Sequence, residues 1–288
     1  MGYSFCVEFS GIQVGFRLPN PITLPEHFAA LQVKNVQNPR DLYQVQLLTL
    51  PLKTDVPPTH VEGDTYIYQT DKGWLHIYPT LGDQDGCQVA CLFCPDGHHT
   101  LYYPASRWEE YSGIWNCTHL IQGERLLLQQ NAFLLHSSLV SIHGKTVLFS
   151  GPSGVGKSTQ AQLWNTHLGA EILNGDRTVV MKKPDGFYGG GSLWSGTSHI
   201  YRRSQAPIAG IFLVTQSPEN RVEQLGFEAF KLLFTQTIVN SWDPVFMQKI
   251  TGLFADLLEQ VPIYRLYCRP DQAAVELAHD TLFGKEMP

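Results

Sequence analysis

The chain has 288 residues, of which 43% are hydrophobic and 16% charged, and its formal net charge is −6 at neutral pH. This length and composition predict a globular protein with a sizeable core, folded as one large domain or two smaller ones. The negative charge and the lack of a clustered Lys/Arg run argue against a nucleic-acid binder, and no segment approaches the ~18 uninterrupted apolar residues of a membrane span. Because the N-terminus lacks a basic start followed by an apolar stretch, we expect no secretory signal and a cytoplasmic protein.

Residues 1–120 are predicted to form a β-rich N-terminal domain whose function the sequence does not indicate. Alternating apolar and polar residues predict a hairpin with strands at 64–69 and 74–78, joined by Thr-Asp-Lys-Gly. A second hairpin is predicted with strands at 89–93 and 100–103, joined by a Pro-Asp-Gly turn.

Three cysteines in this region have a spacing that could hold a metal. Cys87-x-x-x-Cys91-x-x-Cys94 has the spacing that holds an iron–sulfur cluster in radical S-adenosylmethionine enzymes, and His98 or His99 could complete a zinc site instead. Structural cysteines are the main expectation, because Cys91 and Cys94 would point to opposite faces of a strand. The barrel that should follow in a radical S-adenosylmethionine enzyme is also absent, because a phosphate-binding motif follows in the sequence instead. Both metal sites stay open as alternatives.

The second half opens with an apolar segment and a hairpin. Residues 123–136 predict a helix or a long apolar segment that ends at His136. The runs 138–142 and 146–149 then predict a hairpin that turns at His143-Gly144-Lys145. The second run is short, apolar and β-rich, so we expect it to be the strand that leads into the next motif.

The stretch Gly-Pro-Ser-Gly-Val-Gly-Lys-Ser matches the pattern G-x-x-x-x-G-K-[ST] of a Walker A phosphate-binding loop. Its glycines let successive backbone N–H groups surround a phosphate, while Lys157 adds positive charge against the β- and γ-oxygens and Ser158 offers a hydroxyl to Mg²⁺. A helix starting at the lysine would point its positive end at the anion, and Gly169 is its candidate C-cap. The motif therefore predicts binding of a nucleoside triphosphate. The predicted nucleotide-binding residues are Gly151, Pro152, Ser153, Gly154, Val155, Gly156, Lys157, Ser158 and Thr159.

A bound triphosphate also needs an acidic residue to hold Mg²⁺, ordinarily at the end of an apolar strand. The strand at 211–216 ends without an acid, whereas Glu171-Ile-Leu-Asn-Gly leads directly to Asp176. We therefore expect Ser158 and Asp176 to be the metal ligands. The alternative for Asp176 is a plain turn residue in Asn-Gly-Asp.

The remainder of the chain alternates strands and helices, which predicts an α/β domain around a mixed sheet over residues 121–288. The predicted elements are a hairpin turning at 184–186, a strand at 208–214, helices at 228–240 and 243–260, a strand at 263–267 and a helix at 271–283.

These features together resemble a known family. His136, the hairpin after it, the Gly-Pro-Ser-Gly-Val-Gly-Lys-Ser loop and Asp176 resemble the HPr kinase/phosphorylase family, which shares its nucleotide core with phosphoenolpyruvate carboxykinases. The pieces 193–197 and 261–271 are similar to the short HPr-kinase-like proteins, some of which phosphorylate serine on ribosomally made peptides such as lasso peptides. The resemblance covers about residues 125–285 and implies an α/β (α+β) fold, with a β-rich N-terminal region before a P-loop mixed-sheet kinase domain.

The resemblance also implies residue roles. Lys157 and Ser158 would bind phosphate and Mg²⁺, and Asp176 matches the second of two adjacent aspartates in the family, the one near the metal. The first, taken to be the base that accepts the hydroxyl proton, falls on Gly175 here. His136 matches a family histidine near the catalytic aspartate, with a histidine at the end of a segment as the alternative.

The glycine at position 175 leaves the general base open. Such a base is typically worth ~10²–10⁴ in rate, so either Asp176 serves both roles, or the base comes from elsewhere, or catalysis depends on positioning and charge. Arg202 and Arg203 follow the glycine-rich stretch 189–196 and could reach the transferring phosphoryl group, with solvated loop arginines as the alternative. The predicted catalytic residues are Asp176, Lys157, His136 and Arg202.

The motif and the resemblance predict an ATP- and Mg²⁺-dependent kinase that phosphorylates a hydroxyl, first of all serine, on a peptide, a protein or a small molecule. Gly175 motivates a second hypothesis, a nucleotide-binding regulatory module that has lost its chemistry. A phosphorylase or ATP hydrolase is the third. No nucleic-acid or membrane partner is expected, and the resemblance leaves a homo-oligomer open.

Overall fold

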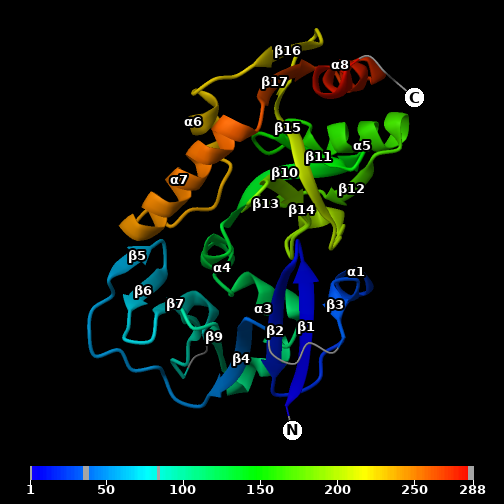
Figure 1. Ribbon diagram of the computed structural model, residues 1–288. Helices are drawn as coiled ribbons and strands as arrows, with labels where there is room; N and C mark the ends of the chain where they lie inside the picture. Colours follow the sequence, from blue (N-terminus) through cyan, green and yellow to red (C-terminus); the bar gives the residue numbers. More distant parts are fainter. Residues whose placement is uncertain (1, 35–38, 83–84, 285–288) are drawn as a thin grey trace. The chain divides into compact units, whose positions relative to one another are not determined.

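The computed structural model describes residues 2–34, 39–82 and 85–284. The chain divides into two units, the first made of Met1–Glu8 and Ile12–Leu126 and the second of Phe9–Gly11 and Leu127–Pro288. Each unit contains a large sheet, and helices accompany both, which confirms the predicted mixed α/β class (Figure 1). Within the described ranges, no helix has the length and apolar character needed to cross a membrane.

The first unit is built around a sheet with the strand order β3-β1-β2-β4-β9-β8-β7-β6-β5. Its described strands are β1 (Tyr3–Phe9), β2 (Ile12–Leu18), β3 (Gln32–Val33), β4 (Asp41–Leu48), β5 (His60–Glu62), β6 (Thr65–Gln69), β7 (Trp74–Tyr78), β8 (Val89–Phe93) and β9 (His98–Pro104). Its helices are α1 (Glu26–Ala29), α2 (Trp108–Tyr111) and α3 (Ile114–His119), and α4 (Gly123–Gln129) crosses the division between the units. The β6–β7 and β8–β9 hairpins confirm both hairpins predicted for this region.

The three closely spaced cysteines lie in and around the β8–β9 hairpin. Among the described residues, Cys87, Cys91 and Cys94 form no disulfide, and all three are buried. His99 is engaged on both ring nitrogens: Nδ1 accepts the backbone N–H of Cys94 at 3.0 Å, and Nε2 lies 3.2 Å from Oδ1 of Asp41. Among the residues that the structure describes, no group of three or more His, Cys, Asp or Glu side chains could hold a metal ion.

The second unit contains a sheet with the order β11-β10-β13-β14-β15-β17-β16, with β12 paired to β10. Its described strands are β10 (Ala132–Ile142), β11 (Lys145–Ser150), β12 (Glu171–Asn174), β13 (Arg177–Lys183), β14 (Gly186–Gly190), β15 (Gln205–Gln216), β16 (Arg221–Gln224) and β17 (Ile263–Cys268). Its helices are α5 (Lys157–Leu168), α6 (Ala229–Phe234), α7 (Pro244–Gln260) and α8 (Gln272–Phe283). β11, β15 and β17 run parallel, so their carboxyl ends meet at one edge of the sheet.

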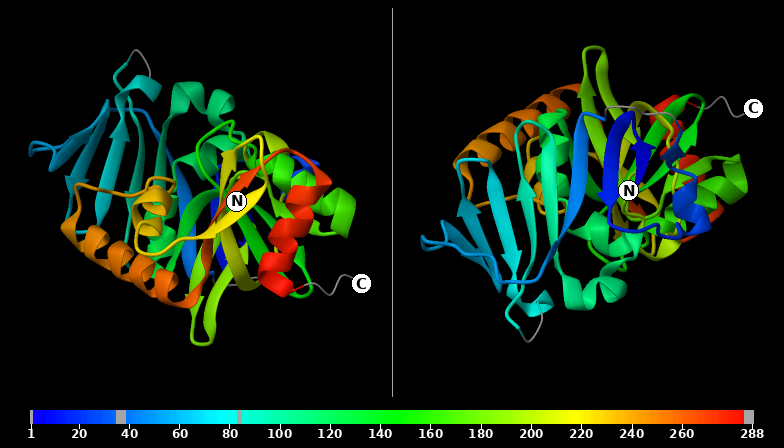
Figure 2. Two further views of the ribbon diagram at one scale, coloured as in Figure 1. Left: turned by 90° about the horizontal axis from the view of Figure 1, so that it is seen from above. Right: turned by 90° about the horizontal axis from the view of Figure 1, so that it is seen from below.

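Helices cover both faces of these parallel strands. Along β11, Val147 and Phe149 pack with α5 and α8, whereas Leu148 packs with α6 and α7. Phe212 and Ile211 of β15 divide in the same way, because successive side chains of a strand point to opposite faces. Figures 1 and 2 show α7 on one side of the strands and the α5–α8 pair on the other.

Two predicted helices are shorter than expected. In the segment 123–136, only the part that forms α4 is helical, and His136 lies on β10. Asn131, whose φ is +55°, lies between the two elements. The helix predicted at 228–240 is wrong beyond α6, because the run Thr-Gln-Thr-Ile-Val after Phe234 pairs with β10 through a bridge between Leu135 and Thr237. Threonine, isoleucine and valine lose side-chain freedom in a helix, so this tertiary pairing prevails.

Candidate functional site

The loop after β11 connects a buried strand directly to the first turn of α5. Gly151, Gly154 and Gly156 have φ values of +140°, +77° and +111°, which glycine adopts without a Cβ clash. α5 begins at Lys157, as predicted, and ends before Gly169. Gly169 adopts a left-handed conformation, and its N–H donates to the carbonyl oxygen of Asn165. Strand, loop and helix therefore follow in the order that a phosphate-binding loop requires.

The ammonium group of Lys157 is held inside this loop. Nζ donates to the carbonyl oxygens of Gly151 at 2.9 Å and Pro152 at 3.0 Å, and the residue is 7% exposed. Burial lowers the pKa of Lys157, and the nearby carboxylate of Asp176 opposes that shift. The loop thus contains a partly desolvated positive charge, which would attract a phosphate group.

Ser158 contacts the segment that carries Asp176. Its hydroxyl donates to the carbonyl oxygen of Gly175 at 3.4 Å, and Ser138 of β10 donates to the same oxygen at 3.0 Å. The oxygen atoms of the two serines lie 3.5 Å apart. The two predicted metal ligands, Ser158 and Asp176, are therefore carried by segments in direct contact. Hydroxyl and carboxylate oxygens are the donors that Mg²⁺ prefers, so these side chains fit that ion.

Asn174 fixes the turn that presents Asp176. Its side chain is fully buried, and Oδ1 accepts the backbone N–H groups of Asp176 at 2.9 Å and Arg177 at 2.8 Å. Its Nδ2 donates to the hydroxyl of Ser192 and to the carbonyl oxygen of Trp194, both at 3.3 Å. Sequence analysis missed Asn174 as a functional residue, although asparagine before glycine at a strand end is the signal of such a turn.

His136 and Arg177 flank the carboxylate of Asp176. Nε2 of His136 lies 3.2 Å from Oδ1, and Nε of Arg177 lies 3.6 Å from Oδ2. Burial lowers the pKa of His136, with Lys157 acting in the same direction and Asp176 opposing. The imidazole is therefore neutral at neutral pH, and its Nε2–H can donate to the carboxylate without cancelling its charge.

The structure places Arg202 away from this cluster. Its Nε pairs with Oε1 of Glu171 at 3.2 Å, at the start of β12, whereas Asp176 follows the end of that strand. The arginine beside Asp176 is Arg177, which the sequence prediction passed over. The reason is register: Arg177 is the partner of His136 in the β10–β13 ladder, so both side chains lie on the same face.

A small cavity of about 220 Å³ adjoins the carboxylate. It is lined by His136, Asp176 and Arg177, by Leu134 on the same face of β10, and by the segment Thr235–Ile238. The backbone of that segment is fixed to the strand, because the N–H of His136 donates to the carbonyl oxygen of Gln236 at 2.8 Å. The cavity combines one apolar wall with charged groups, which suits a small polar ligand held beside Asp176.

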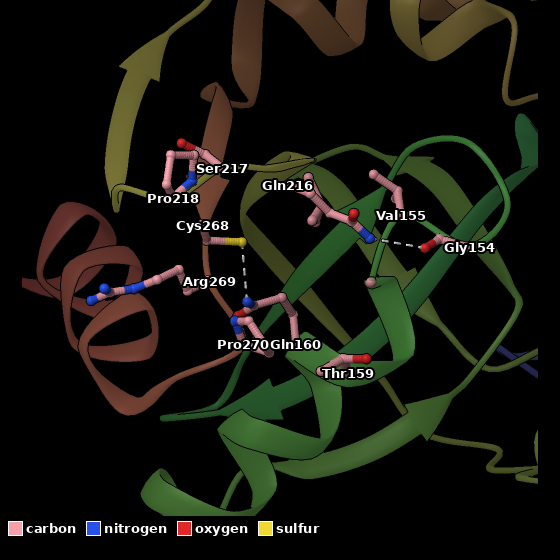
Figure 3. A pocket seen from close by; sticks show the side chains of 12 residues that line it. Gly154, Val155, Thr159, Gln160, Gln216, Ser217, Pro218, Cys268, Arg269 and Pro270 are labelled. Atoms are coloured by element: carbon pink, nitrogen blue, oxygen red, sulfur yellow. Dashed lines mark hydrogen bonds between the residues drawn. The ribbon is translucent and has the colours of Figure 1, made fainter.

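A larger cavity of about 630 Å³ lies against the loop after β11 (Figure 3). It is enclosed by Gly154 and Val155 of the loop, by Gln160 of α5, and by residues that follow β15 and β17. This is the edge where the carboxyl ends of the parallel strands meet, the usual place for a ligand in an open α/β sheet. Sequence analysis missed this cavity, because β15 and β17 come together only through long-range pairing.

The family's expected base position, Gly175, is closely packed against the turn Gly196–Ser198. A Cβ added at Gly175 would lie 2.5 Å from both Cβ and Oγ of Ser198. A Cβ added at Gly196, whose φ is +55°, would lie 2.8 Å from Cγ of Asp176. The turn therefore occupies the space beside Asp176 that a side chain at position 175 would need.

Comparison with known proteins gives a limited result. No family model matches the sequence, and no curated protein matches it. Among solved structures, the HPr(Ser) kinase/phosphatase from Coxiella burnetii is similar, with 14% sequence identity and a TM-score of 0.28. The match covers 52% of this chain and 87% of that one. The similarity is distant, and no residue role is transferred from it.

Proposed function

We propose that the protein is an ATP- and Mg²⁺-dependent phosphotransferase that transfers the γ-phosphoryl group to a hydroxyl, with serine as the first candidate. One observation carries the proposal: the hydroxyl of Ser158 in the phosphate loop contacts the residue immediately before Asp176. The loop and the carboxylate therefore belong to one site. Phosphoryl transfer depends mainly on positioning and on neutralising charge, and both are available there.

Each group in the site has a part in this proposal. The loop amides and Lys157 would hold the triphosphate, while Ser158 and Asp176 would hold Mg²⁺, which supplies charge neutralisation when bound. Arg177 takes the role expected of Arg202, since its guanidinium lies beside Asp176. His136 holds the carboxylate by a hydrogen bond at 3.2 Å.

The acceptor would occupy the cavity between His136, Arg177 and the segment Thr235–Ile238. Its hydroxyl oxygen attacks the γ-phosphorus, the bond to the β-phosphate oxygen breaks, and the hydroxyl proton passes to the carboxylate of Asp176. Asp176 thereby takes over the base role that position 175 does not supply. The acceptor would be a peptide, a protein or a small molecule that presents one compact hydroxyl group.

The proposal is tested by incubating the protein with γ-labelled ATP, Mg²⁺ and fractions of a host extract. We expect a labelled product with the wild type and none with Lys157→Ala or Asp176→Asn, because these remove the loop cation and the carboxylate. The matched control is Lys145→Ala, which removes an exposed lysine at the start of β11 and should leave labelling intact.

The alternatives give different results in the same experiment. Release of labelled phosphate without any acceptor would indicate a hydrolase. ATP binding without label on any fraction, measured by calorimetry, would favour a nucleotide-binding regulatory module, the function that Gly175 motivates. Labelling by Lys157→Ala at the wild-type rate would overturn the proposed site.

A further inference from the structure

A third cavity of the second unit is lined by lysines. It has a volume of about 500 Å³ and lies between the end of the β13–β14 hairpin and α7, which the two views of Figure 2 show side by side. Three of the ten lysines in the sequence line it, namely Lys182, Lys183 and Lys249. Among its described lining residues, Asp256 alone is acidic. The cavity is therefore basic, although the chain as a whole has a net charge of −6.

The charges of this cavity are spread over two elements. Lys182 and Lys183 are successive residues of β13, so their side chains leave the strand on opposite faces. Nζ of Lys182 pairs with Oδ2 of Asp256 on α7 at 2.6 Å, whereas Nζ of Lys183 lies 4.1 Å from the ring centroid of Tyr188 on β14. A compact anion such as phosphate is bound best by donors that converge on it. Spread charges suit instead an extended chain that carries carboxylates at intervals.

Gly252 leaves the helical wall of the cavity open. It lies in the interior of α7, where glycine is unfavourable for a helix. A Cβ added there would have no neighbour within 4 Å beyond the adjoining helix backbone, so no packing contact accounts for the glycine. The residue is exposed and lines the cavity. Because glycine allows another backbone to approach closely, this gap can accommodate a main chain that crosses α7.

We propose that this cavity is a docking site for an extended acidic peptide segment of a partner protein. The carboxylates of the segment contact the three lysines, and its main chain crosses α7 at Gly252. Asp256 fixes the ammonium group of Lys182, and the buried side chain of Leu253 adds an apolar contact. A nucleic acid fits less well, because its continuous row of phosphates would extend beyond the cavity onto a chain of net negative charge.

The docking site is separate from the candidate site at Asp176. The backbone N–H of Lys182 donates to the carbonyl oxygen of Asn131 at 2.9 Å, next to the last pair of the β10–β13 ladder. His136 and Arg177 pair at the opposite end of the same ladder. A bound segment therefore leaves the Asp176 site open, and docking does not depend on the proposed phosphotransferase activity.

The inference is tested by fluorescence anisotropy with labelled hexaglutamate, and with a labelled Gly-Ser peptide of equal length as the uncharged probe. We expect the wild type to bind hexaglutamate but not the Gly-Ser peptide, with an affinity that falls as salt is added, because salt screens exposed charges. Lys249→Glu should weaken binding roughly tenfold, since an attraction becomes a repulsion. Lys231→Glu, the same change at an exposed position of α6 outside the cavity, is the matched control and should bind as the wild type does.

Two further variants separate docking from folding and from the loop after β11. Gly252→Leu should unfold at a temperature no lower than the wild type, because leucine favours a helix and the position is open. Its side chain fills the gap, so the affinity for hexaglutamate should nevertheless fall roughly fivefold. Lys157→Ala removes the cation of the loop and should leave peptide binding unchanged.

The contrary outcomes are distinct. If the wild type does not bind hexaglutamate, or if Lys249→Glu binds it equally well, the docking site is wrong. Unchanged affinity in Gly252→Leu would contradict a main chain crossing α7 at this residue. Tighter binding of citrate or of an oligothymidylate than of hexaglutamate, lost in Lys249→Glu, would assign the cavity to a compact anion or to a nucleic acid and overturn the peptide. Loss of peptide binding in Lys157→Ala would place the peptide at the loop instead.

Discussion

At the scale of single residues, position 175 shows how a glycine can be required by its neighbour. The space where its side chain would lie is filled by Ser198, whose Cβ and Oγ are both 2.5 Å from the position of an added Cβ. Ser198 is itself held in place, because its hydroxyl donates to the carbonyl oxygen of Ser195 at 2.6 Å. Gly175 and Ser198 are therefore a matched pair, since a side chain at position 175 would need a smaller residue at position 198.

This pairing gives a stability prediction. Gly175→Ala should lower the free energy of unfolding by about 1–3 kcal/mol, the usual cost of overpacking, and the loss should be largely restored by adding Ser198→Gly. Thermal unfolding of the single and double variants measures this. Ser198→Ala is the sharper control, since it keeps the Cβ that lies 2.5 Å away and should not restore stability. Equal recovery with glycine and alanine at position 198 would contradict the steric explanation.

At this scale, the structure agrees with the sequence where a backbone conformation follows from one motif. Lys157 and Ser158 lie where a Walker A pattern predicts, because the loop conformation is encoded locally by its glycines. Asn174 and Arg177 were missed, since their roles arise from a buried turn and from cross-strand register. The distinction between Arg177 and Arg202 depends on which strands pair, and a single sequence does not contain that information in readable form.

At the scale of elements, α7 begins where the sequence predicts. Asp243 adopts an extended backbone and its Oδ1 accepts the N–H groups of Val245 at 3.0 Å and Phe246 at 3.1 Å. Pro244 follows at the first helical position, where its missing N–H has no cost. The apolar face of the helix then packs on the strands through Phe246, Ile250 and other buried residues.

Removing this cap should destabilise the second unit. Asp243→Ala should cost about 0.5–2 kcal/mol of the free energy of unfolding, because two N–H groups of the first turn, one of them buried, lose their acceptor. Asp243→Asn keeps an acceptor oxygen and should cost clearly less. Chemical denaturation of the two variants, compared with wild type, checks the order. An alanine variant as stable as the asparagine variant would show that the cap contributes nothing.

Elements with strong local signals were thus predicted well, including β11, α5, α7, β17 and α8. The segment after α6 was not, because Thr237 forms a bridge to Leu135, a tertiary contact between residues more than one hundred positions apart in the chain. That segment lines the cavity beside Asp176, so the error concealed half of the proposed acceptor site. Local propensity indicated the wrong element where a tertiary contact determines the backbone conformation.

At the scale of the whole molecule, each unit has its own determinants of stability, and one in the first unit depends on pH. His76 of β7 is 6% exposed, and burial, with a smaller contribution from Arg125, lowers its pKa from 6.5 to about 3. Between pH 6.5 and about 3, His76 is therefore protonated in the unfolded chain but remains neutral in the folded unit. The free energy of unfolding should fall as the pH falls from 6.5 towards 3, by about 1.4 kcal/mol per pH unit at most.

This prediction is checked by measuring unfolding of the wild type and of His76→Leu between pH 7 and pH 4. The variant has no imidazole to protonate, so its stability should decline less steeply over this range. His60→Leu, the same substitution at a half-buried histidine of β5, is the matched control for the change of side chain itself. Identical slopes for wild type and His76→Leu would show that other groups determine the acid sensitivity.

The positions of β15 and β17 have a consequence for biosynthesis. The loop after β11 starts at Gly151, but the cavity beside it is completed by residues as late as Pro270. During translation, the loop is therefore synthesised more than one hundred residues before the last residues that line the cavity. Domains generally fold as units during synthesis, so the continuous part of the first unit, Ile12–Leu126, can form early. The nascent protein would thus complete this cavity only near the end of translation.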